Sequence, residues 1–519
     1  MQLRDKIERF IPSISAVETL LKQMVRIAVI VLFAYYAGQF MGSIILINRY
    51  LVPVVIFIGF LFVLLSSAKQ KFYLLSTAVF LPLMFPRFFV REVKWIELLS
   101  LLFGFLMILD LMIKREKLFD RRIKIYYVAI GIISIWSLIH FAQNPVLGGF
   151  FGESISQGGI RSYFAIFVGI SLFFYSFWYF RDRLAETDKL LNYLMFLALF
   201  FGYLRLAGYF LQFNIPFFGG NFDFNGDLYK DFTRIGGLME MSVLGIAVCL
   251  TLYSKNNWGV KHITLLVLFL ILLFFSGARG GFMGVLLMFL VYLTFISSRY
   301  FMPLTILLVL FAGSYVMFLQ NAELPGQVKR LTALEGGIKK QDKYRKQAYE
   351  TLMERFMENP VFGKGIGISG ELSGGAMSAL VQEDEAMQQG KTKKDENEPA
   401  KELQMKSSRI SKEDLQKLAG FRGGHGSYMS IIGLYGIGGL IYFLIMLYGS
   451  IYFAFKVFRG HSAFDREAKL ALFAFLYLTA RTLIYIPEGT GYDSMELWFI
   501  AGMVAALRVR YGIGDEVEA

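Results

Sequence analysis

The sequence predicts an all-α polytopic membrane protein, a bundle of 12–14 transmembrane helices with one large external loop that itself contains helices. Two observations predict this fold class. Hydrophobic residues make up 56% of the 519 residues, charged residues make up 18%, and the mean hydropathy of +0.52 lies outside the range of soluble globular domains. Apolar runs also recur along the whole chain, and most approach the ~20 residues that a helix needs to cross a bilayer.

Fourteen candidate spans follow from these runs: 27–47, 51–68, 72–86, 95–113, 125–142, 162–180, 189–213, 236–253, 262–275, 280–297, 301–319, 428–455, 467–486 and 494–508. The pairs at 51–86 and 262–297 can be divided differently, which leaves 12 or 13 spans as alternatives. An even number of spans keeps both termini on one side of the membrane.

The distribution of lysine and arginine predicts which side that is. The basic blocks "KREKLFDRRIK" at 114–124 and "KVFRGHSAFDREAK" at 456–469 fall on the same side as the charged N-terminal segment. The positive-inside rule places this side in the cytoplasm. The net charge of +13 follows from this topology and from the external loop, and it does not indicate nucleic-acid binding.

The predicted organisation has five parts. They are a cytoplasmic amphipathic N-terminus (1–26), the first part of the helix bundle (27–319), a large periplasmic or external loop (320–426), the C-terminal membrane helices (427–508) and a cytoplasmic tail (509–519). The first apolar run lacks a small-residue cleavage pattern, so we expect an uncleaved signal anchor.

The external loop contains its own structural signals. Tyr344, Ala348, Leu352 and Phe356 are spaced by four residues, which predicts one face of a helix, and "NP" at 359–360 is expected to end it. The following "VFGKGIGISG" predicts a tight glycine-rich turn. Residues 371–418, rich in Glu, Gln, Lys and Ser, predict a flexible insertion.

Arginines gather on the predicted external face, among them Arg234, Arg279 and Arg345, and Arg205 lies inside a span toward its external end. Arg279 lies in "FFSGARGGFMG", where small residues separate two apolar runs and a new helix is expected to begin. A guanidinium beside free helix N-terminal amides favours an anion. Arg205 and Arg481 lie inside spans, where an exposed guanidinium is costly, so we expect both to point into the bundle.

One histidine is the candidate acid–base residue. His425, in "RGGHGSYMS", is flanked by glycines that leave its ring accessible, and an unperturbed pKa near 6.5 suits proton transfer at neutral pH. His140 lacks glycine or basic neighbours and is interpreted as structural.

Other site chemistries find little support. The four histidines form no metal-binding pair and no Ser/His/Asp triad, and the single cysteine, Cys249, allows neither a disulfide framework nor a thiolate cluster. No metal or other cofactor is therefore predicted. Spacing singles out none of the external carboxylates, which are Glu153, Asp223, Asp227, Asp231, Glu240, Glu488 and Asp493.

Three stretches, in this order, resemble the motifs of the O-antigen ligase and polymerase superfamily: "SGARGGFMGVLLMFL", "YRKQAYETLMERFMENPVFGKGIGISG" and "GGHGSYMSIIGLYGIGGLIYFL". They cover about residues 230–450, with the large external loop in the family's place. The resemblance implies a metal-independent, inverting membrane glycosyltransferase whose donor is a glycan on undecaprenyl diphosphate. It also implies a location in a bacterial inner membrane.

The resemblance also implies roles for individual residues. Arg279 and Arg234 are expected to hold the pyrophosphate, with Arg205 or Arg345 in support, and His425 is expected to act as general base on the acceptor hydroxyl or to orient it. The acceptor is lipid A core, as in lipopolysaccharide biosynthesis, or another glycan or a protein. An O-antigen or exopolysaccharide polymerase, a protein O-oligosaccharyltransferase and a lipid-linked sugar flippase remain the alternatives.

Overall fold

The computed structural model describes residues 67–81, 95–114, 119–143, 159–184, 187–211, 237–252, 260–295, 353, 356–363, 427–460, 465–486 and 494–511. Contacts divide the chain into two units, Met1–Lys71 and Phe72–Ala519. The first unit is described only over its last five residues, 67–71, where Ser67 and Gln70 bond to each other at the start of a helix. The packing below belongs to the second unit.

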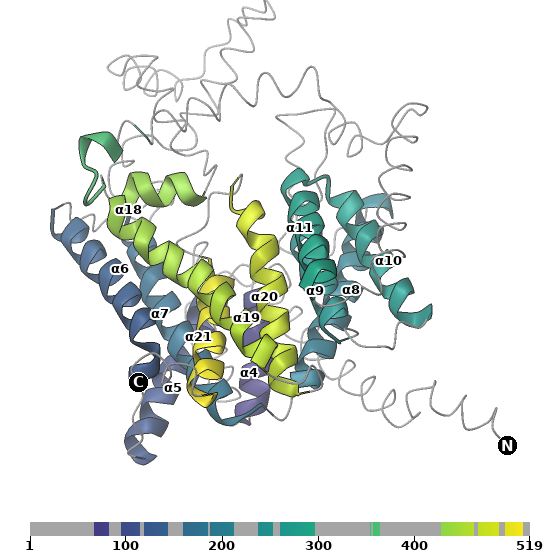
Figure 1. Ribbon diagram of the computed structural model, residues 1–519, viewed down its shortest axis with the longest axis horizontal. Helices are drawn as coiled ribbons and strands as arrows, with labels where there is room; N and C mark the ends of the chain where they lie inside the picture. The colour runs from purple at the N-terminus through teal and green to yellow at the C-terminus, as the bar shows by residue number, and fades with distance from the viewer. Residues whose placement is uncertain are drawn as a thin grey trace, which may run out of the picture. The chain divides into compact units, whose positions relative to one another are not determined.

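The described residues form helices joined by turns, with no strand among them (Figure 1). The α-helices are α4 (Ala68–Phe80), α5 (Trp95–Lys114), α6 (Lys124–Gln143), α7 (Gly159–Asp182), α8 (Thr187–Leu211), α9 (Leu238–Leu252), α10 (Val260–Ser276), α11 (Arg279–Phe295), α18 (Ser427–Leu444), α19 (Ser450–Gly460), α20 (Arg466–Ile484) and α21 (Met495–Arg510). A 3-10 turn, η2 (Arg121–Ile123), precedes α6, and a π-helical turn, η6 (Ile445–Gly449), joins α18 to α19.

The predicted all-α polytopic membrane fold is confirmed. Within the described residues, five segments are long and apolar enough to cross a membrane: Ile96–Lys114, Arg121–Ala142, Tyr163–Asp182, Thr187–Gly208 and Ile431–Gly460. Three shorter apolar helices lie at Leu238–Leu252, Val260–Ser276 and Gly280–Phe295. The predicted spans 27–47 and 301–319, and nearly all of 51–68, lie outside the described residues, so the count of 12–14 stays a prediction.

Small residues let α7 and α21 approach closely. A Cβ on Gly502 of α21 would collide with Ser176 and with the backbone of Phe173, and the Ser176 hydroxyl donates to the carbonyl of Phe499 at 2.8 Å. On the opposite side of the contact, Gly169 of α7 accommodates the indole of Trp498. Helix packing in lipid depends on such close backbone approach, because apolar surface alone gives no driving force there.

A second group of helices packs around α9 and α20. Tyr203 of α8 donates its hydroxyl to the carbonyl of Leu268 in α10 at 3.0 Å, and Gly202 accommodates Leu272 of the same helix. Helix α9 is buried along its length and contacts α8, α10, α11 and α20.

Helix α18, in the predicted span 428–455, is bent at Gly436. That residue has φ 60° and ψ −150°, which is not helical, and the halves on either side run in different directions (Figure 1). An L side chain rarely adopts this conformation, so glycine carries the bend. We call residues 427–435 the α18 half-helix.

The bend at Gly436 contacts the turn at residues 359–363, which follows the predicted helix of the external loop. Residues 356–358 are helical and the chain turns at 359–363, which confirms the predicted helix end at Asn359 and Pro360. The amide of Gly363 donates to the carbonyl of Asn359 at 2.7 Å, and the amide of Ile437 donates to the carbonyl of Pro360 at 2.9 Å. We call residues 359–363 the NPVFG turn.

His140 contacts the same turn. It is buried in α6, and its Nε2 lies 2.7 Å from the carbonyl oxygen of Phe362. Its ring also makes an edge contact with Tyr435, at 5.9 Å between centroids. These contacts hold helix, turn and half-helix together, and they support the interpretation of His140 as structural.

Candidate functional site

A buried ion pair lies between the end of α20 and the start of α21. Arg481 donates through Nη2 to Oε2 of Glu496, and the two residues are only 5% and 8% exposed. The Ser494 hydroxyl donates to the same Glu496 oxygen at 3.3 Å and lies 2.7 Å from the Tyr485 hydroxyl. The bonds supply the partners that two buried charges require.

The Arg481 guanidinium also lies over the rings of two tyrosines. The Arg481 Cζ lies 5.2 Å from the ring centroid of Tyr485 and 5.8 Å from that of Tyr477. A delocalised cation binds favourably over such rings when water is excluded. Arg481 therefore points into the bundle, as predicted for an arginine placed inside a span.

The break before α11 brings that helix start to this cluster. Ser276 accepts a hydrogen bond from the amide of Ala278 at 3.2 Å, Gly277 turns the chain with φ 61°, and α11 begins at Arg279. This confirms the predicted helix start after the small-residue break. The first turn of α11 presents backbone amides without intrahelical partners, and such amides favour an anion.

Two glycines fix how the start of α11 sits between α9 and α20. A Cβ on Gly281 would lie 2.6 Å from Cγ of Met239, in the first turn of α9. A Cβ on Gly284 would lie 2.6 Å from the carbonyl oxygen of Ala480 and 2.9 Å from Cγ1 of Ile484. The start of α11 is thus in contact with the residues next to Glu240 and Arg481.

We expect Gly284→Ala to destabilise the protein, because the new methyl meets the α20 backbone, which cannot move aside as a side chain end can. Overpacking of this kind costs about 1–3 kcal/mol. Gly131→Ala in α6 is the matched control, since nothing lies within 4 Å of a Cβ there, and we expect it to preserve or raise stability. Thermal unfolding in detergent measures both, and equal midpoints would contradict the close packing of α11 on α20.

The start of α9 adds a carboxylate near the same place. Gly237 has φ 82° and its carbonyl accepts from Met241 at 3.1 Å, so α9 begins directly before Glu240. The Oε2 atom of Glu240 is buried, and it has no hydrogen-bond partner among the described residues. Spacing did not distinguish Glu240 from the other carboxylates, because its position depends on helix packing.

Arg205 lies at about the level of the first turn of α9 along the bundle. In the contact between α8 and α9, Sγ of Cys249 lies 3.5 Å from Sδ of Met195. Successive membrane helices run in opposite directions, so ten residues along α8 from Met195 correspond to ten residues back along α9 from Cys249. Arg205 is only 5% exposed, which confirms that it points inward.

The α18 half-helix reaches the same end of α20. The Tyr428 hydroxyl donates to the carbonyl of Thr482 at 3.3 Å and lies 3.0 Å from the Tyr448 hydroxyl. The Tyr428 ring packs edge-on against Phe443, at 5.0 Å between centroids, and Phe443 in turn contacts Tyr485. The residue after Arg481 thus binds a side chain that lies three positions after His425.

Two of the five predicted site residues lie among the described residues. Arg205 is described in full and Arg279 by its backbone, at the start of α11, while Arg234, Arg345 and His425 lie outside the described residues. Glu496, Ser494 and Tyr485 were not predicted. A signal existed for them, because a buried arginine in a span implies a partner, and "YDSMELW" carries a carboxylate near the start of the following span.

Over the part of the chain that the structure describes, no three residues of the types His, Cys, Asp and Glu come together in a group suited to a metal ion. The polar groups at these helix ends are instead two arginines, two carboxylates and tyrosine and serine hydroxyls. Arginine binds carboxylate or phosphate oxygens, two at a time where the geometry allows.

Comparison with known proteins bears on this region. Residues 264–444 match the model of a family described as O-antigen ligase, a segment that runs from α10 through the start of α11 to the end of α18. No curated protein matches the chain. The match supports an enzyme of the O-antigen ligase or polymerase type, acting on a lipid-linked glycan and an acceptor in a membrane. The predicted resemblance to the O-antigen ligase and polymerase superfamily is thereby confirmed over residues 264–444.

Proposed function

We propose that this chain is an O-antigen ligase-like glycosyltransferase. It moves a glycan from undecaprenyl diphosphate to an acceptor hydroxyl, on lipid A core or a similar acceptor, at the periplasmic face of a bacterial inner membrane. Both termini lie in the cytoplasm. The observation that carries the proposal is that α9, α11, α20 and α21 bring charged ends together within the bundle, around the segment that matches the family.

The donor side of the proposal is electrostatic. As the glycosidic bond breaks, its electron pair moves to the diphosphate, and negative charge grows on that leaving group. Arg279 and Arg234 hold the diphosphate, supported by Arg205 or Arg345, and the amides of the first α11 turn add partial positive charge. Guanidinium stays protonated at neutral pH, so the leaving group is stabilised without a metal ion.

The acceptor side rests on His425. The acceptor oxygen attacks the anomeric carbon from the face opposite the diphosphate, its bond to carbon forms as the bond to the leaving oxygen breaks, and His425 takes the hydroxyl proton or orients the hydroxyl. Tyr428 supports this placement, because it contacts Thr482 beside Arg481 and only two residues separate it from His425 in the sequence.

Two enzyme alternatives share this donor chemistry. A polymerase joins repeat units, and a protein O-oligosaccharyltransferase uses a protein hydroxyl as acceptor. Glycan analysis after gene deletion separates the first from a ligase: long chains stranded on the lipid carrier indicate a ligase, whereas single repeats on the acceptor indicate a polymerase.

Purified protein tests the enzyme against a flippase. We expect it, in nanodiscs with an undecaprenyl-diphosphate-linked glycan and an acceptor, to release undecaprenyl diphosphate and to raise the acceptor's mass by one glycan, unchanged by EDTA. His425→Ala is expected to lower release by about 100-fold or more, the low end of the range for loss of a general base. His262→Ala, at the predicted cytoplasmic end of α10, is the control and should retain the parental rate.

A second assay, with the same protein in liposomes, measures whether the donor crosses the bilayer. Donor that crosses the bilayer with no release of undecaprenyl diphosphate would contradict the enzyme and support the flippase. Release that persists in both His425→Ala and Arg279→Ala would leave the enzyme standing and overturn the assignment of its site.

A further inference from the structure

We propose that the NPVFG turn (359–363) is a positioning element: it sets the direction of the α18 half-helix (427–435) and thereby the place of His425. This inference rests on the proposed function, because it gives His425 its acceptor-side role. It assigns to Trp136, Gly363 and Gly436 a part in the reaction although none of them touches the reacting groups.

The turn and the bend fit each other backbone to backbone. A Cβ on Gly436 would lie 2.5 Å from the carbonyl oxygen of Val361 and 2.6 Å from that of Pro360. A Cβ on Gly363, where φ is 70°, would lie 2.5 Å from the carbonyl of Leu434 and 2.6 Å from the amide of Gly436. Because each glycine leaves space only for the other segment's backbone, neither segment can change its direction independently.

The bond across the bend also satisfies the broken helix. In a continuous helix, the amide of Ile437 would bond to a carbonyl four residues before it, but the bend at Gly436 interrupts this pattern. The carbonyl of Pro360 replaces that partner, at 2.9 Å. The turn therefore stabilises the bent form of α18 specifically, since in the straight form this amide has a partner of its own.

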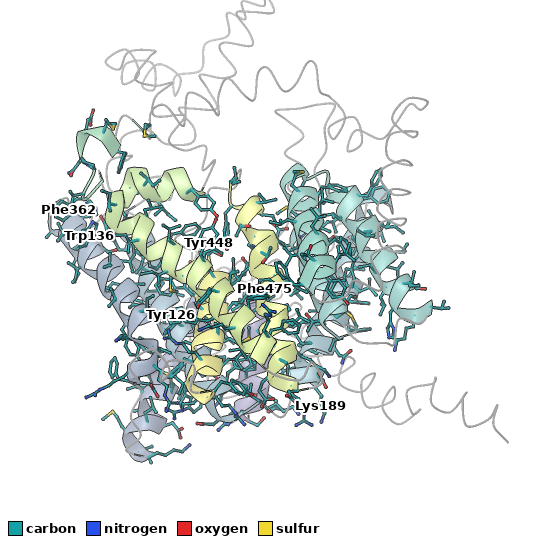
Figure 2. All side chains as sticks on the ribbon, viewed as in Figure 1. Tyr126, Trp136, Lys189, Phe362, Tyr448 and Phe475 are labelled. Carbon is teal, nitrogen blue, oxygen red and sulfur yellow. The ribbon has the colours of Figure 1, made fainter. Side chains whose placement is uncertain are left out.

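Helix α6 holds the turn in place from the other side. Nε1 of Trp136 donates to the carbonyl of Val361 at 3.0 Å, and the indole stacks on Phe362 with 5.2 Å between centroids (Figure 2). His140, one turn further along α6, contacts the Phe362 carbonyl. The turn thus links a membrane-spanning helix to the bend in another.

The far end of the half-helix is also held. Tyr428 is bound to the carbonyl of Thr482 in α20 and to Tyr448 in η6. The half-helix is therefore fixed at two points: the NPVFG turn sets its direction at Gly436, and Tyr428 holds its first turn against α20. In the sequence, His425 lies three positions before Tyr428.

A small change of angle at Gly436 produces a larger displacement at the far end of the half-helix. Nine residues of helix span about 14 Å, so a tilt of about 10° at Gly436 moves the first turn by about 2 Å. A displacement of about 1 Å in a reacting group can cost 100-fold in rate. Small changes at the turn are therefore expected to lower turnover while the diphosphate-binding arginines stay in place.

Trp136→Phe tests the inference with a small change, since phenylalanine keeps the ring on Phe362 and removes only the Nε1–H donor. We expect turnover to fall about three- to tenfold, the effect of one lost hydrogen bond on the position of the half-helix, with the KM for the lipid-linked donor and the thermal midpoint unchanged. Trp178→Phe in α7 is the matched control and should retain parental turnover. Unchanged turnover in Trp136→Phe, or a loss matched by Trp178→Phe, would overturn the proposal.

A distance measurement tests it without any activity. Spin labels at Ser427→Cys, the first residue of the half-helix, and at Phe200→Cys, on the exposed face of α8, report the half-helix position once Cys249, the single native cysteine, is replaced by alanine. We expect the distance distribution to shift or broaden by about 2 Å in Gly436→Ala and Trp136→Phe. Distributions equal to the parent's in both variants would overturn the positioning role. An inactive parent with these shifts would instead contradict the proposed function alone.

Discussion

Replacing Arg481 with methionine is expected to lower the free energy of unfolding by about 3–5 kcal/mol, the range for breaking a buried ion pair by removing one partner. The change leaves the Glu496 carboxylate in a site where it is 8% exposed, with Ser494 as its remaining donor. Methionine fills the space beside Tyr477 and Tyr485, so lost packing contributes little. Thermal unfolding in detergent, with the parent's reversibility checked, measures the effect.

Two further variants separate the charge from the packing. Arg481→Met with Glu496→Leu removes both charges, and we expect it to recover most of the loss, because no unpaired charge is then buried. Arg510→Met disrupts a more exposed pair with Glu467, at 3.8 Å, so we expect it to cost less than about 1 kcal/mol. A double variant as unstable as Arg481→Met would contradict this account of the ion pair.

Much of the bundle was predictable because the bilayer imposes a simple rule on the sequence. A span must be apolar over roughly 20 residues, so the start of α11 after "SGA", the ends of α6 and α7, and the separation of α20 from α21 all follow from composition and small-residue breaks. The inward direction of Arg205 and Arg481 followed from the same rule, since a guanidinium in lipid is costly.

The bend in α18 was not predictable from the same signals. Gly436 lies in a run with three other glycines, at 433, 438 and 439, and composition alone does not say which one leaves the helical conformation. The choice depends on the NPVFG turn, which lies far away in the sequence and supplies the carbonyl that Ile437 needs. Periodicity describes one helix at a time, so it does not detect a bend stabilised by another segment.

In the candidate site, too, individual residues could be identified from the sequence, whereas their contacts could not. The presence of an arginine at the start of α11 and of a carboxylate in the first turn of α9 could be read from the sequence. The pairing of Arg481 with Glu496 and the approach of Tyr428 to α20 depend on which helices are neighbours. Neighbour relations in a membrane bundle are set by small-residue contacts such as those of Gly281 and Gly284, and no single-sequence pattern specifies the partner.

Arg279→Ala is expected to lower the rate of undecaprenyl diphosphate release by about 100-fold or more, the effect of removing one preorganised donor to a developing charge. On the proposed function, Arg279 and the first amides of α11 face the same diphosphate, and alanine removes the guanidinium while it preserves the helix. Arg279→Lys retains a charge but loses the planar pair of donors, so we expect an intermediate loss of about tenfold. Single-turnover measurement of release, with saturating donor, separates this effect from donor binding.

Arg459→Ala provides the comparison for that experiment. Arg459 lies in the last turn of α19, on the predicted cytoplasmic side, and its guanidinium is over Phe455 with Cζ 5.5 Å from the ring centroid. Loss of an arginine there removes the same charge from the protein without changing the candidate site, so release should stay within about twofold of the parent, as a surface change away from the site predicts. If Arg279→Ala behaved like Arg459→Ala, the helix start at Arg279 would not bind the leaving group. The charged ends of α8, α20 and α21 would then be the remaining candidate binding site for the diphosphate.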